Sequence, residues 1–141
     1  MKKFSKDNYD TDEALNELMQ GSGVIVFSDV FSLEDINLAR EIVNHFADTQ
    51  DQKESHFNAE AEASGKIQLQ QRVWNLFSKG DVFSKLISDD LIFILMSKLL
   101  GNEFFCGSYC ASRLLPGSPG QELHLDYPYW DFYKTETFPM G

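Results

Sequence analysis

Cysteine is scarce in this 141-residue chain, which contains only Cys106 and Cys110. In a strand these two side chains share a face but lie about 13 Å apart at about 3.3 Å per residue, too far for a disulfide. The cysteines and histidines also lack the spacing of a zinc site. We therefore expect two buried free thiols and a fold that does not depend on disulfides.

Basic residues and long apolar runs are also in short supply. Twelve Lys and Arg against 22 Asp and Glu give a net charge of -10, which disfavours nucleic acid and anionic lipid as partners. The longest apolar stretch, Leu91–Leu100, is interrupted by Ser97 and Lys98 and is too short to cross a bilayer. The basic start Met1–Lys3 leads into polar residues rather than a secretory signal. We expect a soluble, cytoplasmic protein with a small-molecule substrate and no nucleic-acid or membrane partner.

Apolar and aromatic residues are well represented. The chain is 43% hydrophobic and holds 12 Phe, 5 Tyr and 2 Trp, enough for one packed core. The polar, charged stretch Asp48–Lys66 predicts a long surface loop that is mobile at least in part. Helical patterns fill the first two-thirds and strand patterns the last third, so we expect one α+β domain over residues 1–141.

Helices are predicted where apolar residues recur at helical spacing behind a capping residue. Four such segments begin at residues 10–13, at Ser32, at Asp81, and at residue 89 or 90, the last ending at Gly101. The helix behind Ser32 has a predicted apolar stripe of Ile36, Ala39, Val43 and Phe46. Strands are predicted over residues 24–27, 67–70, 104–111 and 121–127, with a tight turn at 116–120 before the last. Trp74 is expected in the core, and Arg72 in solvent.

The chemistry of the chain is concentrated in the strand predicted over residues 121–127. Side chains two apart in a strand project from the same face, so His124 and Asp126 would present an imidazole and a carboxylate to one point. Such donors suit a divalent first-row metal, as in the two-histidine, one-carboxylate site of non-haem iron oxygenases. The motif is short, and the alternative is a surface pair making ordinary hydrogen bonds.

Residues beside this pair have two readings each. Gln121 contacts the co-substrate or is structural, and strand alternation places it on the face opposite His124. Tyr127, Tyr129 and Trp130 either line an apolar substrate pocket or pack in the core. The other two histidines are poorer ligand candidates, because His45 is predicted to point away from the apolar stripe of its helix and His56 falls in the polar loop.

Several segments together have the pattern of a known enzyme family. They are Gly23-Val24-Ile25-Val26, Val30-Phe31-Ser32, Ala39-Arg40, Leu99-Leu100-Gly101, Gly107-Ser108-Tyr109-Cys110-Ala111, Pro116-Gly117-Ser118-Pro119-Gly120-Gln121 and His124-Leu125-Asp126-Tyr127-Pro128-Tyr129-Trp130. In these segments the sequence resembles the phytanoyl-CoA dioxygenase family of Fe(II)/2-oxoglutarate oxygenases. The resemblance covers nearly the full chain, and its most specific part is the run from Pro116 to Trp130.

This resemblance implies a double-stranded β-helix, the cupin-like jelly roll, with N-terminal helices packed on the sheet. It also implies Fe(II) held by His124, Asp126 and a distal histidine, with 2-oxoglutarate as co-substrate and a downstream Arg or Lys as its anion partner. Residues 127–141 contain neither His nor Arg. We therefore expect the N-terminal portion of such an enzyme, carrying half of the iron site.

Two other functions fit the same residues. One is an inactive, truncated oxygenase-like protein that self-associates through the edges of its open sheet. The other is a cupin-like metal protein of different chemistry, although that class usually gathers several histidines and His124 is the only one in the predicted hairpin.

Overall fold

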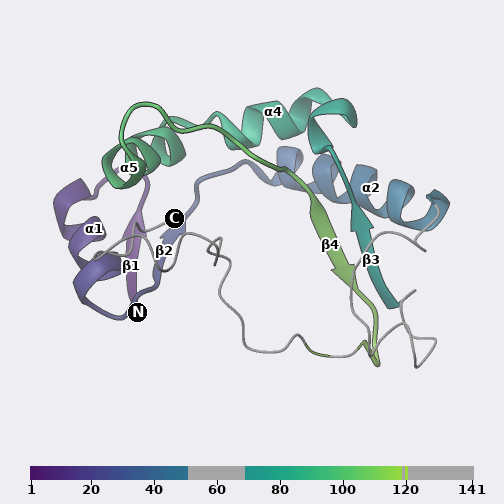
Figure 1. Ribbon diagram of the computed structural model, residues 1–141, viewed down its shortest axis with the longest axis horizontal. Helices are drawn as coiled ribbons and strands as arrows, with labels where there is room; N and C mark the ends of the chain where they lie inside the picture. Colours follow the sequence, from purple (N-terminus) through teal and green to yellow (C-terminus); the bar gives the residue numbers. More distant parts are fainter. Residues whose placement is uncertain (51–68, 119, 121–141) are drawn as a thin grey trace, which may run out of the picture.

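The computed structural model describes residues 1–50, 69–118 and 120, and over these residues the chain is a mixed α+β protein (Figure 1). The described helices and strands follow one another in the order β1 (Lys2–Ser5), α1 (Thr11–Gln20), β2 (Ile25–Ser28), α2 (Leu33–Thr49), β3 (Gln70–Val73), the short 3₁₀ helix η2 (Leu76–Ser78), α4 (Asp81–Ile87), α5 (Asp90–Leu100) and β4 (Ala111–Leu114). None of the described helices is long and apolar enough to cross a membrane.

These elements form two packing groups, which Figure 1 shows at opposite sides of the described structure. In the first group β1 and β2 pair in parallel, with Phe4 opposite Phe27, and α1 and α5 pack beside them. In the second group β3 and β4 pair antiparallel, with Val73 opposite Ala111, and α2 packs against both strands and against α4. Each sheet has two strands over the described residues and is open.

Three of the predicted helices begin at side-chain caps, as the sequence indicated. The side chain of Asp10 accepts a hydrogen bond from the backbone N–H of Glu13 at 2.7 Å. Ser32 Oγ accepts one from Asp35 N at 3.1 Å, and Asp89 accepts one from Leu91 N at 3.0 Å. Each cap satisfies a backbone donor that the first helical turn leaves unpaired. The starts predicted for α1, α2 and α5 are therefore confirmed.

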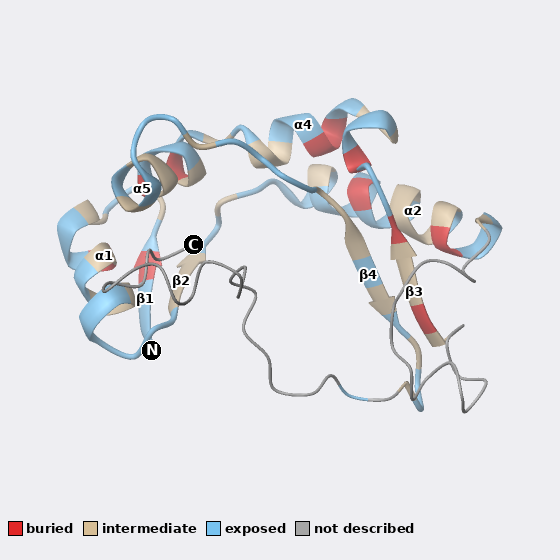
Figure 2. Ribbon diagram, in the orientation of Figure 1, coloured by how far each residue is buried: buried red, intermediate tan, exposed pale blue. Residues whose placement is uncertain are grey.

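The main core lies in the second group, between α2 and the β3–β4 sheet, where Figure 2 shows buried residues on facing elements. Val73 of β3 is fully buried, and Ala39 and Ala47 of α2 are buried in the same cluster. Because alanine side chains are small, the helix and the sheet can lie close together. Leu76, Val82 and Phe83 complete the cluster.

Two predicted strands differ from the structure. Residues 67 and 68 of the strand predicted over 67–70 lie outside the described residues, and β3 runs from Gln70 to Val73; residues 104–110 are not part of the strand predicted over 104–111, because β4 begins at Ala111. Tyr109 explains the second error: its backbone carbonyl accepts a hydrogen bond from Leu76 N at 3.0 Å, and its ring packs edge-on against Phe77 and Phe83. The segment before β4 therefore closes the core instead of extending the ladder.

Several burial predictions are also wrong. Trp74 was expected in the core but is 46% exposed, because its neighbour Val73 takes the position that faces α2. Arg72, expected in solvent, is partly exposed, which agrees with that prediction, and its guanidinium lies 4.9 Å from the Trp74 ring centroid in a cation–π contact on the opposite face. Ile36, which was placed in the apolar stripe of α2, is exposed, and so is the free thiol of Cys106.

The burial of Val73 yields the first testable prediction. Val73→Ala should lower the free energy of unfolding by about 2–4 kcal/mol, because it removes buried methyl groups and leaves a cavity beneath α2. The matched control is Val24→Ala at a residue that is 50% exposed, for which a change within about 0.5 kcal/mol is expected. Urea unfolding followed by circular dichroism measures both values. Equal losses in the two variants would show that Val73 is not the packing centre.

Candidate functional site

The residues predicted to carry chemistry follow β4 in the chain. Gln121, His124, Asp126, Tyr127, Tyr129 and Trp130 all lie outside the described residues, so their roles stay predictions. The described structure does show the strand and turn that precede them, and these set the direction in which the chain enters the candidate site.

The chain reverses direction just after β4. Leu115 N donates a hydrogen bond to Leu69 O at 2.9 Å, which continues the pairing with the segment before β3. Ser118 N then donates to Leu115 O at 3.0 Å, closing a four-residue turn. Gly117 has a φ of 85°, the left-handed value that a type II turn requires at its third position, and Pro116 occupies the second position that proline favours. The tight turn predicted from Pro116 and Gly117 is confirmed.

One face of the β3–β4 sheet is occupied by a polar network centred on Arg113 of β4. Its Nε donates to Gln71 Oε1 of β3 at 2.6 Å, and its Nη1 donates to Asn44 Oδ1 of α2 at 3.1 Å. Its Nη2 also pairs with the Asp48 carboxylate near the end of α2. One guanidinium thus joins both strands to the helix, which uses the several fixed donors that distinguish Arg from Lys.

The Arg113 network also changes the acidity of its carboxylate partner. The hydrogen bond from Arg113 lowers the pKa of Asp48 below its ordinary value, and the positive charge of the guanidinium acts in the same direction. Asp48 is exposed, so water screens part of this attraction. At neutral pH the charged pair is formed.

The two faces of the sheet therefore differ in character. Val73, Ala111 and the Arg113 network face α2, where packing fills the space. Ser112 and Leu114 alternate with these residues along β4 and are exposed, and Leu114 is 65% accessible to solvent. Arg72 Nε donates to Ser112 Oγ at 3.3 Å on this second face. The face toward α2 is filled, and the second face combines exposed Ser112 and Leu114 with Gln70, which lies opposite Leu114 and is 4% exposed.

The described histidine and carboxylate residues do not gather into a metal site. Over residues 1–50, 69–118 and 120, no group of three or more His, Cys, Asp and Glu side chains is placed to hold a metal ion. His45 is exposed on α2, as predicted, with its ring 5.3 Å from that of Phe46. His56 lies outside the described residues.

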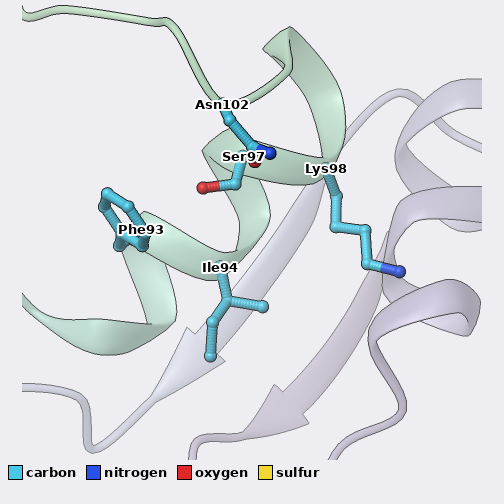
Figure 3. Close-up of a pocket in the computed structure, with 5 residues that line it drawn as sticks. All are labelled: Phe93, Ile94, Ser97, Lys98 and Asn102. Carbon is cyan, nitrogen blue, oxygen red and sulfur yellow. The ribbon is translucent and has the colours of Figure 1, made fainter.

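A shallow hollow lies on the outer side of α5, and the sequence did not predict it. Figure 3 shows it bordered by five residues of α5 and the segment that follows, namely Phe93, Ile94, Ser97, Lys98 and Asn102. The Ser97 hydroxyl is buried there without a hydrogen-bond partner. Phe93 is exposed, and its ring lies 5.6 Å from that of Phe104. The available signal was the apolar run Leu91–Leu100. It is longer than one buried helix face needs, so some of its residues had to face outward.

Comparisons of the chain with protein-family models, with curated proteins and with solved structures gave no match.

The Arg113 network generates the second prediction. Arg113→Met should lower the free energy of unfolding by about 1–2 kcal/mol, because half-buried Gln71 and Asn44 lose the donor that links them. The control is Arg40→Met, since Arg40 is exposed and donates a hydrogen bond to Asn37 on the same helix. A change within about 0.5 kcal/mol is expected for that control.

The pH dependence of unfolding checks the same network. Because the folded pKa of Asp48 is lowered, its contribution to stability is present above the unfolded pKa of about 3.9 and is lost as the pH falls through the folded value. Arg113→Met should therefore flatten the acid side of the stability curve compared with the parent. Parallel acid limbs in parent and variant would contradict the assigned contact.

Proposed function

We propose that this chain carries the His124 and Asp126 half of a mononuclear Fe(II) site in a 2-oxoglutarate-dependent oxygenase related to the phytanoyl-CoA dioxygenases. The observation that carries the proposal is the H-x-D motif that follows the Pro116–Gly117 turn, with His124 seven residues after Gly117. A tight turn at the end of a strand is what a hairpin requires, so we expect residues 121–127 to form a second strand. The open α+β arrangement of the described residues is compatible with part of such a fold.

The chemistry of the donors fits the metal. An imidazole nitrogen and a carboxylate oxygen are two of the three ligands that non-haem iron oxygenases use, and no further His occurs after Asp126 in this chain. Bound iron would supply the redox chemistry that activates dioxygen for hydroxylation of a C–H bond. The protein residues would hold and orient the metal, the co-substrate and the substrate.

The proposal also assigns the face on which the site lies. Residues Gln121–Tyr127, if extended beside β4, would place His124 and Asp126 on one face together with Glu122, and Leu123 and Leu125 on the other. The face toward α2 is filled by Val73 and the Arg113 network, so we assign the metal pair to the face of Ser112 and Leu114. Tyr127, Tyr129 and Trp130 are the candidates for an apolar substrate pocket and Gln121 for a contact of 2-oxoglutarate, although strand alternation places Gln121 and Tyr127 on the face opposite His124.

Metal binding tests the proposal directly. In anaerobic titration calorimetry the 141-residue chain should bind Fe(II), and His124→Ala or Asp126→Ala should weaken binding at least about tenfold, the lower bound for loss of an outer-shell partner. His45→Ala provides the control, because it removes an exposed histidine of α2 and should leave binding unchanged. Equal affinity in the parent and His124→Ala would exclude this site.

The alternative function, self-association of an inactive oxygenase-like chain, has its own supporting observation. The edge of β4 that faces away from β3 has no partner strand among the described residues, and Leu114 beside it is exposed. Such an edge offers unpaired backbone donors and acceptors to a second copy. Under this alternative the chain would pair with itself, and metal binding would not be needed.

Size-exclusion chromatography with light scattering distinguishes the two functions. Self-association predicts a mass that rises with concentration above 16.1 kDa, and Leu114→Lys should return it to the monomer value. Leu33→Lys is the control, since Leu33 is 81% exposed on α2 and away from the strand edge. A monomer at every concentration, together with Fe(II) binding, rejects self-association and favours the oxygenase.

A further inference from the structure

Two short chain segments that connect the packing groups are contacted by one lysine, while a third connection, residues 101–110, leads from α5 to β4. The first segment, residues 29–32, leads from the end of β2 to the start of α2. The second, residues 88–89, leads from the end of α4 to the start of α5. Each segment therefore has one end in the group of β1, β2, α1 and α5 and the other in the group of α2, α4, β3 and β4.

Lys6 contacts both segments from the turn that follows β1. Its Nζ donates to Asp89 Oδ2 at 2.5 Å and to Val30 O at 3.4 Å. The Asp89 side chain is 15% exposed and that of Lys6 34%, so the pair is partly protected from water. Asp89 also caps α5, which means that the same carboxylate fixes the lysine and the first turn of the helix.

A second lysine joins the far ends of the same two segments. Lys85 of α4 donates to Asp35 Oδ2 of α2 at 2.6 Å. Asp35 lies in the first turn of α2, where the 29–32 segment enters, and Lys85 lies in the last turn of α4, where the 88–89 segment leaves. The two connections are thus held together on both sides of the junction.

The other ion pairs between described residues each lie within one packing group. Met1 with Glu17, Lys2 with Glu13 and Lys98 with Asp12 lie in the first group, and Arg113 with Asp48 lies in the second. Every element pair with extensive packing also belongs to one group or the other. Asp29 in the first connection has a φ of 59°, which an aspartate adopts only at some cost in backbone energy. Among the described residues, Lys6 donates hydrogen bonds to both short connections, and Lys85 binds Asp35 at their far ends.

We propose that Lys6 is a latch: its bonds to Asp89 and Val30 hold the two packing groups in one relative orientation, and the connections at 29–32 and 88–89 act as a hinge when those bonds are lost. The inference is independent of any metal site, because all of its residues lie in the described part of the chain. The inference gives Lys6 a conformational role that the sequence alone did not indicate.

Pulsed dipolar spectroscopy on the full 141-residue chain tests the latch. Spin labels at Asn16→Cys on α1 and Glu41→Cys on α2, in a background of Cys106→Ser and Cys110→Ser, report the distance between the groups from two exposed sites. The parent should give one narrow distance distribution. Lys6→Met keeps most of the apolar stem and removes both donors, so its distribution should lose that single narrow maximum.

Hydrogen exchange gives a second readout of the same variants. Amide exchange at Leu91 and Phe93, in the first turn of α5, should rise about tenfold in Lys6→Met, because the charge-assisted bond that orders Asp89 is lost. Lys2→Met is the matched control, since Lys2 pairs with Glu13 inside one group. It should change neither the distance distribution nor exchange in α5.

The variants also separate a latch from a general loss of stability. Asp89→Asn keeps a capping side chain but removes the charge that binds Lys6, so it should broaden the distance distribution while α5 remains helical. If circular dichroism shows that Lys6→Met does not fold, the distance distribution of Asp89→Asn alone tests the latch. A parent distribution that is already broad, an unchanged distribution in Asp89→Asn, or equal broadening in Lys2→Met overturns the proposal.

Discussion

The close packing of α2 against the β3–β4 sheet is the interaction on which the rest of the described structure depends. Val73 is buried beneath the helix, and Ala39 and Ala47 leave the space that lets the sheet approach. Because side chains alternate along a strand, burying Val73 also decides which face every neighbour occupies. It turns Trp74 outward, sets Ala111 opposite in the ladder, and leaves Ser112 and Leu114 on the open face.

The Arg113 network adds directional bonds to this apolar contact. Hydrophobic burial alone would tolerate some sliding of the helix over the sheet, because it has no preferred direction. A guanidinium that bonds to Gln71, Asn44 and Asp48 fixes the helix and the strands at one point. In a chain with a net charge of -10, a basic residue placed among acidic and amide groups also offsets local repulsion.

The sequence correctly predicted features that depend on residues a few positions apart. It did not predict features that depend on contacts between distant segments. The caps at Asp10, Ser32 and Asp89 and the Pro116–Gly117 turn each depend on residues a few positions apart, so sequence patterns reveal them. Strand β1 was missed because its partner β2 lies far along the chain and Phe4 is its one buried residue. The choice of Val73 over Trp74 for the core depends on α2, which no local pattern contains.

A similar limit applies to residues 104–110. Their aromatic and small side chains have the composition of a strand, yet Tyr109 packs across Phe77 and Phe83 and its carbonyl binds Leu76 N. Burial also raises the pKa of the Tyr109 hydroxyl, as expected for a ring used in packing. Tertiary contacts thus overruled strand propensity at the segment that leads into β4.

The candidate metal pair depends on backbone conformation more than on residue type. Two positions apart, His124 and Asp126 converge in an extended strand, whereas in a helix they would diverge by about 200° around the axis. Pro116 lacks a backbone N–H, and Gly117 adopts a left-handed conformation, so the backbone of this turn is not helical. We expect an extended segment after it, because a strand beside β4 would pair with the backbone groups of the β4 edge that no described strand occupies. That energetic preference is the physical basis for expecting the imidazole and the carboxylate to share a face.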